Sequence, residues 1–190
     1  MGMEHMFRMF KKDMSFVHAV MEVRTDWCIE IYKRAAELGA ELIVMGDDAA
    51  HRGGSMISPQ MWRELVLPYH QRVAREVPVP VIWHSDGKMD KLLPFAVEAG
   101  FAGVHGLETL SGNKLDEVKA QYGDKLILIG NVDINLFFEP NLDLIRADVK
   151  RSYEQGGTSG YMISSCNSIY PGMNPEALRE YFRCQGGIDG

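Results

Sequence analysis

Residues 96–108, AVEAGFAGVHGLE, run from a helical stretch through a glycine into a short apolar strand that ends in polar residues. The same order recurs in AELGAELIVMGDD (36–48) and in YEQGGTSGYMISSC (153–166). Glycine suits the end of each helical stretch because it tolerates a positive φ. Two further runs with strand character lie between these copies, PVIWHSD (80–86) and KLILIGNVD (125–133). Strands that alternate with helices predict an α/β fold with a parallel sheet of about five strands.

Helical patterns occupy the segments around these strands. Apolar residues recur at near-helical spacing over residues 14–38. The segment SPQMWRELVLPYHQRVARE (58–76) begins with a serine N-cap and a proline at the first helical position, and Pro68 would kink or break it. The connections are short and no linker divides the chain, so we expect residues 1–190 to form a single domain. Four shorter helices are predicted at 88–100, 113–123, 142–156 and 175–185.

Composition narrows the class of protein. The chain has 190 residues, of which 46% are hydrophobic and 24% charged, and this is enough apolar material for a folded core. A net charge of −6 argues against a general nucleic-acid-binding face. No uncharged apolar run is long enough for a transmembrane helix, so no membrane segment is expected. Three widely separated cysteines fit a reducing compartment, and we expect a cytoplasmic protein.

Polar side chains follow each predicted strand at its carboxyl end. In parallel α/β folds this edge of the sheet carries the site. The sequence therefore predicts a reaction pocket at this edge, with His84 near its centre. The polar residues are Asp47 and Asp48, the run His84 to Asp86, His105 and Glu108, Asn131 and Asp133, and the run Ser164 to Asn167.

Four motifs carry a resemblance to a known family. They are GDDAAHRGGSMISPQMWRELVLPYHQRV (46–73), VIWHSDG (81–87), GNVD (130–133) and IYPGMNPEAL (169–178). In this order they resemble the C-terminal half of the uroporphyrinogen decarboxylase superfamily, which also contains corrinoid-dependent methyltransferases. The resemblance implies a TIM-barrel-like (β/α)8 fold, here an incomplete barrel of about five parallel strands with flanking helices. An open barrel exposes strand edges, so this chain is either a fragment or is covered by another chain, for example in a homodimer.

The HSDG motif is the main candidate for chemistry. In the methyltransferase branch, similar proteins carry His-x-Cys-Gly here and a second cysteine after the last strand, and these residues hold a zinc ion. The present chain keeps His84 but has Asp86 in place of the first cysteine, and aspartate can bind zinc through oxygen. The resemblance thus implies a zinc site with His84 and Cys166 as ligands, and Glu108 or Asp48 could supply a further oxygen ligand. An alignment through YPGMNPE, however, places Asn167 rather than Cys166 at the second cysteine.

The carboxylates near this motif have alternative interpretations. Asp48 is a candidate general base or metal ligand, and we assign catalytic roles to His84, Asp86 and Asp48. Adjacent strand residues point to opposite faces, so Asp47 and Asp48 are not expected to share a pocket. Asp86 could instead be the N-cap of a helix that begins near Lys88.

Four residues are assigned to substrate binding. Asn131 and Asp133 lie in the GNVD motif, which lines the pocket in the enzymes that this chain resembles. Asn167 and Tyr170 follow the last strand, near and within the fourth motif. Asn131 has a second interpretation as part of a loop Asx-turn.

The resemblance implies methyl transfer between a small methylated substrate or thiol and a corrinoid carried on a partner protein. One alternative is decarboxylation of uroporphyrinogen by a longer parent protein. That branch binds its substrate through an Asp and arginines in the N-terminal part of the barrel, and it carries a His where this chain has Asn167. Another alternative is a non-catalytic fragment or subunit that docks through its open edge.

Overall fold

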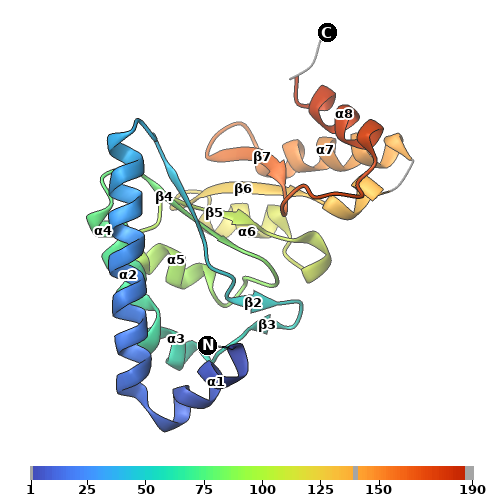
Figure 1. Cartoon of the computed structure of the whole chain (residues 1–190). Coiled ribbons are helices and arrows are strands. Elements are labelled where there is room, and N and C mark those ends of the chain that lie inside the picture. The colour runs from blue at the N-terminus through green and yellow to red at the C-terminus, as the bar shows by residue number, and fades with distance from the viewer. Residues whose placement is uncertain (1, 139–140, 187–190) are drawn as a thin grey trace.

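The computed structural model describes residues 2–138 and 141–186 of the chain (Figure 1). Its main sheet has the strand order β1-β4-β5-β6-β7, and every neighbouring pair is parallel. A small antiparallel hairpin, β2 with β3, follows β1. The predicted parallel sheet of about five strands is therefore confirmed. The strands are β1 (Ile43–Gly46), β2 (Ala50–His51), β3 (Gly54–Ser55), β4 (Val81–Ser85), β5 (Gly103–Gly106), β6 (Ile127–Val132) and β7 (Tyr161–Ser165).

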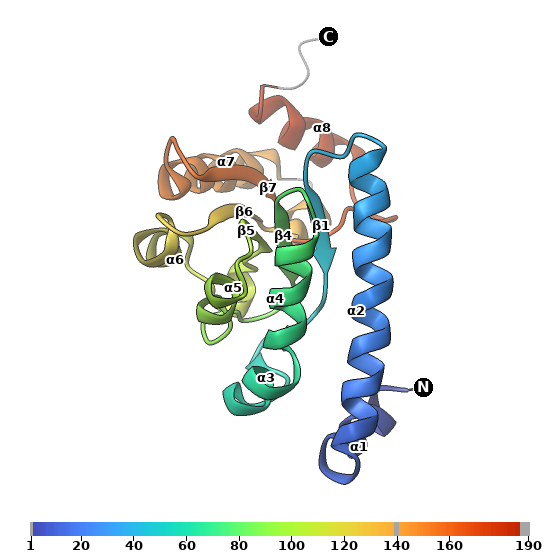
Figure 2. The same ribbon diagram turned by 90° about the vertical axis from the view of Figure 1, so that its left-hand side faces the viewer.

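Helices cover one face of the sheet. Figure 2 shows α4, α5, α6 and α7 on one side of the strands, with the long helix α2 beside β1. As predicted, Ser58 caps α3 by accepting a hydrogen bond from the backbone of Met61, and the long pattern is interrupted beside Pro68. The helices are α1 (Met3–Lys12), α2 (Met14–Glu37), α3 (Pro59–Leu65), α4 (Leu67–Glu76), α5 (Leu93–Ala99), α6 (Leu115–Tyr122), α7 (Leu142–Gly156) and α8 (Pro175–Cys184), with 3-10 turns η1 (Thr109–Ser111) and η2 (Ile134–Phe138).

The main core lies between the sheet and these helices. Four residues that stand side by side in neighbouring strands form its centre, and all four are buried. A second apolar cluster packs α7, α8 and η2 against the ends of β6 and β7. Burial of this apolar surface is the main force that holds the helices on the sheet. The four central residues are Met45, Trp83, Val104 and Leu128.

The opposite face of the sheet is largely open. Val44, Ile127 and Met162 lie on it, and they are 53%, 37% and 51% exposed. Among the described residues no further strand pairs with the outer edges of β1 and β7, so the sheet does not close into a barrel. This is the incomplete barrel that the sequence predicts.

Candidate metal centre

Strand register places two histidines side by side on the open face. His84 of β4 pairs in register with His105 of β5. Ser85 points the other way and is buried, and its hydroxyl accepts a hydrogen bond from the backbone N–H of Ala49 (3.0 Å) and donates one to the carbonyl of Asp86 (2.9 Å). Ser85 therefore ties the loop after β1 to the loop after β4, and both loops carry carboxylates.

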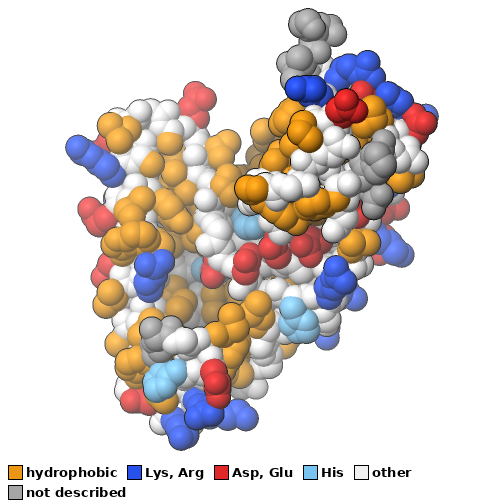
Figure 3. Space-filling model, turned by 45° about the vertical axis from the view of Figure 1, so that its right-hand side comes forward, with side chains coloured by type: hydrophobic (Ala, Val, Ile, Leu, Met, Phe, Trp, Pro, Cys, Tyr) orange, Lys and Arg blue, Asp and Glu red, His pale blue; other side chains and the backbone are white. Residues whose placement is uncertain are grey.

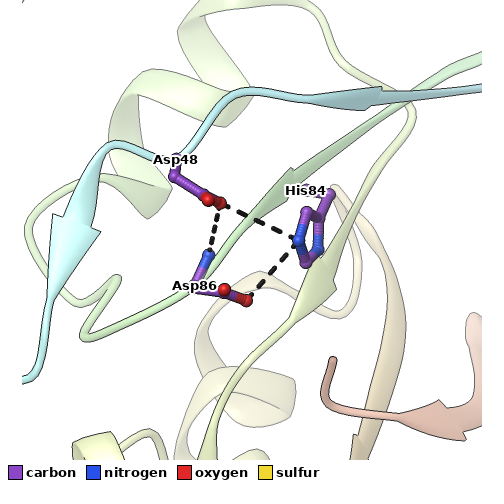
Figure 4. A group of neighbouring side chains, drawn as sticks. All are labelled: Asp48, His84 and Asp86. Atoms are coloured by element: carbon purple, nitrogen blue, oxygen red, sulfur yellow. Dashed lines mark hydrogen bonds and ion pairs between the residues drawn. The ribbon is translucent and has the colours of Figure 1, made fainter. Parts of the chain in front are cut away.

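Three side chains converge at this edge of the sheet. Figure 4 shows Asp48, His84 and Asp86 pointing toward one another, from the loop after β1, from β4 and from the loop after β4. The Nε2 atom of His84 lies 3.5 Å from Oδ1 of Asp86 and 3.8 Å from Oδ1 of Asp48. One ligand atom from each residue lies within 4.8 Å of the other two. An imidazole and two carboxylates at this spacing can hold a divalent cation.

The two carboxylate oxygens of Asp86 differ in their hydrogen bonding. Its Oδ2 accepts a hydrogen bond from Nδ2 of Asn167 at 2.7 Å, whereas its Oδ1 is buried and has no hydrogen-bond partner among the described residues. Burial raises the pKa of Asp86, and the nearby carboxylates of Asp48 and Glu108 raise it further. An unpaired buried carboxylate oxygen is costly, and a bound cation would satisfy it. The residues present therefore fit a metal ion.

Acidic side chains gather around this point. Figure 3 shows Asp and Glu side chains grouped in the hollow of the molecule, next to a histidine. Such a concentration of negative charge in a recess favours cations over anions.

His105 is the neighbour of His84 on the side away from the carboxylates. The two Nδ1 atoms are 2.8 Å apart, and Nε2 of His105 lies 3.2 Å from the carbonyl oxygen of Ser165. Burial lowers the pKa of His105, and the adjacent His84 lowers it further. The sequence pattern placed His105 among the polar residues at this edge of the sheet but did not point to a role for it.

Comparisons with known proteins show the family of the chain. The family model for uroporphyrinogen decarboxylase (URO-D) matches residues 1–185. The chain belongs to the URO-D family. The resemblance that the four motifs carry is thus confirmed.

The relatives of this URO-D family chain include two kinds of enzyme. A methylated-thiol–coenzyme M methyltransferase of Methanosarcina mazei is 37% identical over 99 residues, which are 52% of this chain and 26% of the relative. A uroporphyrinogen decarboxylase of Geobacter sp. (strain M21) is 30% identical over 173 residues, 89% of this chain and 48% of the relative. The chain thus spans less than half the length of these curated relatives.

A solved structure shares the fold of this chain. A solved methyltransferase from Methanosarcina mazei superposes with a TM-score of 0.83 at 22% identity, over 96% of this chain and 52% of the other. The likeness supports a TIM-barrel-like arrangement. None of the helices in residues 2–138 and 141–186 has the length and apolar content that crossing a membrane requires.

The structure does not bring Glu108 or Cys166 into the three-residue group. Glu108 accepts hydrogen bonds from the N–H of Gly87 (3.1 Å) and the hydroxyl of Ser111 (2.7 Å), so it holds the loop that follows Asp86. Cys166 packs into the second apolar cluster, and burial raises the pKa of its thiol to about 12. The thiol thus lies among apolar side chains and outside the three-residue group.

Asn131 and Asp133 of the GNVD motif are engaged within the protein. The buried amide of Asn131 donates to the carbonyl of Leu107 (3.1 Å) and accepts from the guanidinium of Arg151 (3.1 Å). The carboxylate of Asp133 accepts from the backbone and the side chain of Asn135 (2.9 and 2.6 Å), which forms a turn at η2. Asn131 therefore ties β6 to the loop after β5, and Asp133 stabilises the turn that follows β6.

Asn167 and Tyr170 lie in different surroundings. Asn167 reaches the three-residue group through its hydrogen bond to Asp86. Tyr170 is exposed and packs against the ring of Phe138, with 5.6 Å between the ring centroids. Of the four residues assigned to substrate binding, Asn167 is the one that contacts the candidate metal centre.

The two adjacent aspartates after β1 take opposite directions. Asp47 accepts a hydrogen bond from the buried His70 of α4, with 2.8 Å between its Oδ2 and the Nε2 of His70, while Asp48 faces His84. The expectation that they do not share a pocket is confirmed. Asp86 is not a helix cap, because α5 begins only at Leu93.

Proposed function

We propose that His84, Asp48 and Asp86 hold a zinc ion and that the site serves methyl transfer involving a small thiol. The observation that carries the proposal is the unpaired, buried Oδ1 of Asp86, which faces Nε2 of His84 at 3.5 Å. The relatives named for methyl transfer support the choice of reaction. They include the Methanosarcina mazei protein and a methylcobamide:CoM methyltransferase of Methanosarcina barkeri, 26% identical over 137 residues.

Each residue has a distinct part in this mechanism. A zinc ion held here would lower the pKa of a substrate thiol and keep it as the thiolate, which is the nucleophile. Asn167 fixes Oδ2 of Asp86 and so leaves Oδ1 directed at the metal position. Asp48 accepts the N–H of Asp86 at 3.1 Å and thereby keeps the two carboxylates at a constant separation. A corrinoid carried by a partner protein would supply the methyl group to this thiolate or accept it from the methylated thiol.

The oxygen ligands set the character of the metal. Carboxylates are harder ligands than thiolates, so zinc in this site would keep more of its positive charge. A more positive zinc ion stabilises a thiolate more strongly but also makes it less nucleophilic. We expect a small, readily ionised thiol to be the better substrate.

Decarboxylation of a porphyrinogen is the second candidate function. The observation in its favour is the extent of the match, because a uroporphyrinogen decarboxylase aligns with 89% of this chain and the methylated-thiol enzyme with 52%. Anaerobic incubation with uroporphyrinogen distinguishes the two. Release of carbon dioxide without added metal would support decarboxylation and contradict the zinc mechanism.

We also propose that a second copy of the chain covers the open face. Val44 of β1 and Met162 of β7 are exposed there, beside strand edges that nothing else pairs within the described residues. Unpaired edges with apolar side chains favour association.

Zinc content tests the proposed site most simply. Purified untagged protein is loaded with zinc, desalted and analysed by elemental mass spectrometry, alongside His84→Ala and, as a matched control, His5→Ala on the exposed face of α1. We expect one zinc per chain in the wild type and the control, and a loss in His84→Ala. The loaded protein is then given methylcobalamin and coenzyme M. Equal zinc in both variants, or no methyl transfer, would contradict the proposal.

A further inference from the structure

Resting on the proposed metal site, we propose that His105 is a positioning residue that fixes His84 in the tautomer whose Nε2 is free to bind metal. The geometry that points to this is a chain of contacts. It runs from the carbonyl of Ser165 through both nitrogens of His105 to Nδ1 of His84.

The neighbours of Nε2 of His105 show whether this nitrogen carries a proton. It lies 3.2 Å from the carbonyl oxygen of Ser165, and a carbonyl oxygen can only accept a hydrogen bond. Nε2 therefore carries the proton. The hydroxyl of Ser164, at 3.4 Å, is a longer second contact and can also accept.

The next contact joins the two Nδ1 atoms. At 2.8 Å they share one hydrogen bond, so one nitrogen carries the proton and the other accepts it. A neutral His105 with its proton on Nε2 has a bare Nδ1, so it accepts. His84 then donates through Nδ1, and its own Nε2 is left without a proton.

The distances around Nε2 of His84 exclude the reverse arrangement, in which His105 donates to Nδ1 of His84. If His105 carried both protons, the Nε2 of His84 could be protonated and would donate to a carboxylate. Its distances to Asp86 and Asp48 are 3.5 and 3.8 Å, longer than an N–H···O hydrogen bond. The contacts of the described residues also give His105 no carboxylate partner that would stabilise a buried cation.

The contact between His105 and His84 orients a histidine ligand through the ring nitrogen that does not bind the metal. A histidine ligand commonly donates its other ring N–H to a carboxylate or carbonyl, which orients the ring and selects the tautomer. Here another imidazole takes that place. It stands on the neighbouring strand in register, so the sheet itself sets the distance.

The direct test is the tautomeric state in the metal-free protein. Long-range ¹H–¹⁵N NMR spectra of ¹⁵N-histidine-labelled protein distinguish Nδ1–H from Nε2–H. We expect His84 as the Nδ1–H form and His105 as the Nε2–H form. A spectrum with His84 as Nε2–H, or with His105 doubly protonated at neutral pH, would overturn the inference. Because no metal is present, this result is independent of whether the proposed methyl transfer occurs.

Two variants test whether His105 affects the affinity for zinc. His105→Leu removes the acceptor, and we expect zinc to bind about 10–100-fold more weakly by competition with a chelator. His105→Asn places an amide oxygen where Nδ1 stood, so we expect zinc affinity within about threefold of the wild type, since the second contact is kept. Thermal unfolding of the metal-free variants checks that both fold. Wild-type zinc affinity in His105→Leu would overturn the inference, and if that variant does not fold, the NMR result decides.

Discussion

Replacing Asp86 by Asn should change the stability of the metal-free protein and its zinc binding in opposite directions. The Asn can still accept from Asn167 through its carbonyl oxygen, as Oδ2 of Asp86 does at 2.7 Å. Its NH2 group takes the place of the unpaired Oδ1, 3.5 Å from Nε2 of His84, and would donate to this nitrogen once the two side chains move slightly closer. The substitution thus removes a buried charge and fills an empty hydrogen-bonding position. It also removes a metal ligand.

The size of both effects follows from the structure. An unsatisfied buried polar group costs about 1–3 kcal/mol, and we take the lower end, about 1 kcal/mol, because the side chain of Asp86 is 32% exposed. For a chain of this length that raises the melting temperature of the metal-free protein by about 2–4 °C. Zinc at 100 times its Kd stabilises the wild type by about 2.7 kcal/mol, or roughly 5–10 °C. Asp86→Asn should show no such zinc shift.

The pH dependence has a definite sign. Burial raises the pKa of Asp86, so the folded metal-free protein binds more protons than the unfolded chain between the two pKa values. Wild-type stability therefore falls as pH rises through this window, and that fall is absent in Asp86→Asn. The stability advantage of Asp86→Asn should be small in acid and complete above the folded pKa.

Differential scanning fluorimetry with and without zinc measures all of these effects. Asp90→Asn is the matched control, because Asp90 is exposed and lies outside the metal group. We expect its melting temperature and zinc shift to match those of the wild type. A metal-free Asp86→Asn that is less stable than the wild type, or one that keeps the zinc shift, would refute the reasoning.

Three further predictions concern the rest of the molecule. Cys166→Ser should leave zinc stoichiometry unchanged by elemental analysis, because the thiol is buried outside the metal group; a loss of zinc would restore Cys166 as a ligand. Gly87→Ala should cost at least about 1–3 kcal/mol in urea unfolding, since Gly87 has φ +81° and a Cβ would lie 2.7 Å from the backbone of Ala50; unchanged stability would contradict the packing of this loop. Val44→Asp should turn a dimer into a monomer by light scattering, whereas Leu144→Asp on the exposed side of α7 should not; equal masses for the two variants would exclude the open face as the interface.

Much of the fold could be predicted because its signals are local. Gly100 ends α5 with φ +84°, as the glycine pattern predicts. The start of that helix could not be predicted, since it depends on distant contacts. Asn113 accepts the N–H of Met89 and donates to the carbonyl of Gly87, and these two bonds hold the loop that precedes α5, which begins at Leu93.

The candidate site could likewise be predicted only in part from the sequence. Asp48 and His84 could be placed together because the carboxyl ends of neighbouring parallel strands meet. The role of His105 depends on the register of β4 with β5, which a sequence pattern does not determine. Cys166 lies next to Ser165 in the chain, but the N–H of Cys166 bonds to Val132 and its thiol turns into the second apolar cluster. One residue past the end of β7, the direction of the backbone thus decides whether the side chain enters the pocket or the apolar core.

The most direct test of the central claim is a crystal structure of the zinc-loaded protein with anomalous data collected on both sides of the zinc absorption edge. We expect one anomalous peak within bonding distance of Nε2 of His84 and of an oxygen of both Asp48 and Asp86. A peak at Cys166 instead, or protein crystallised with excess zinc and no peak beside His84, would contradict it.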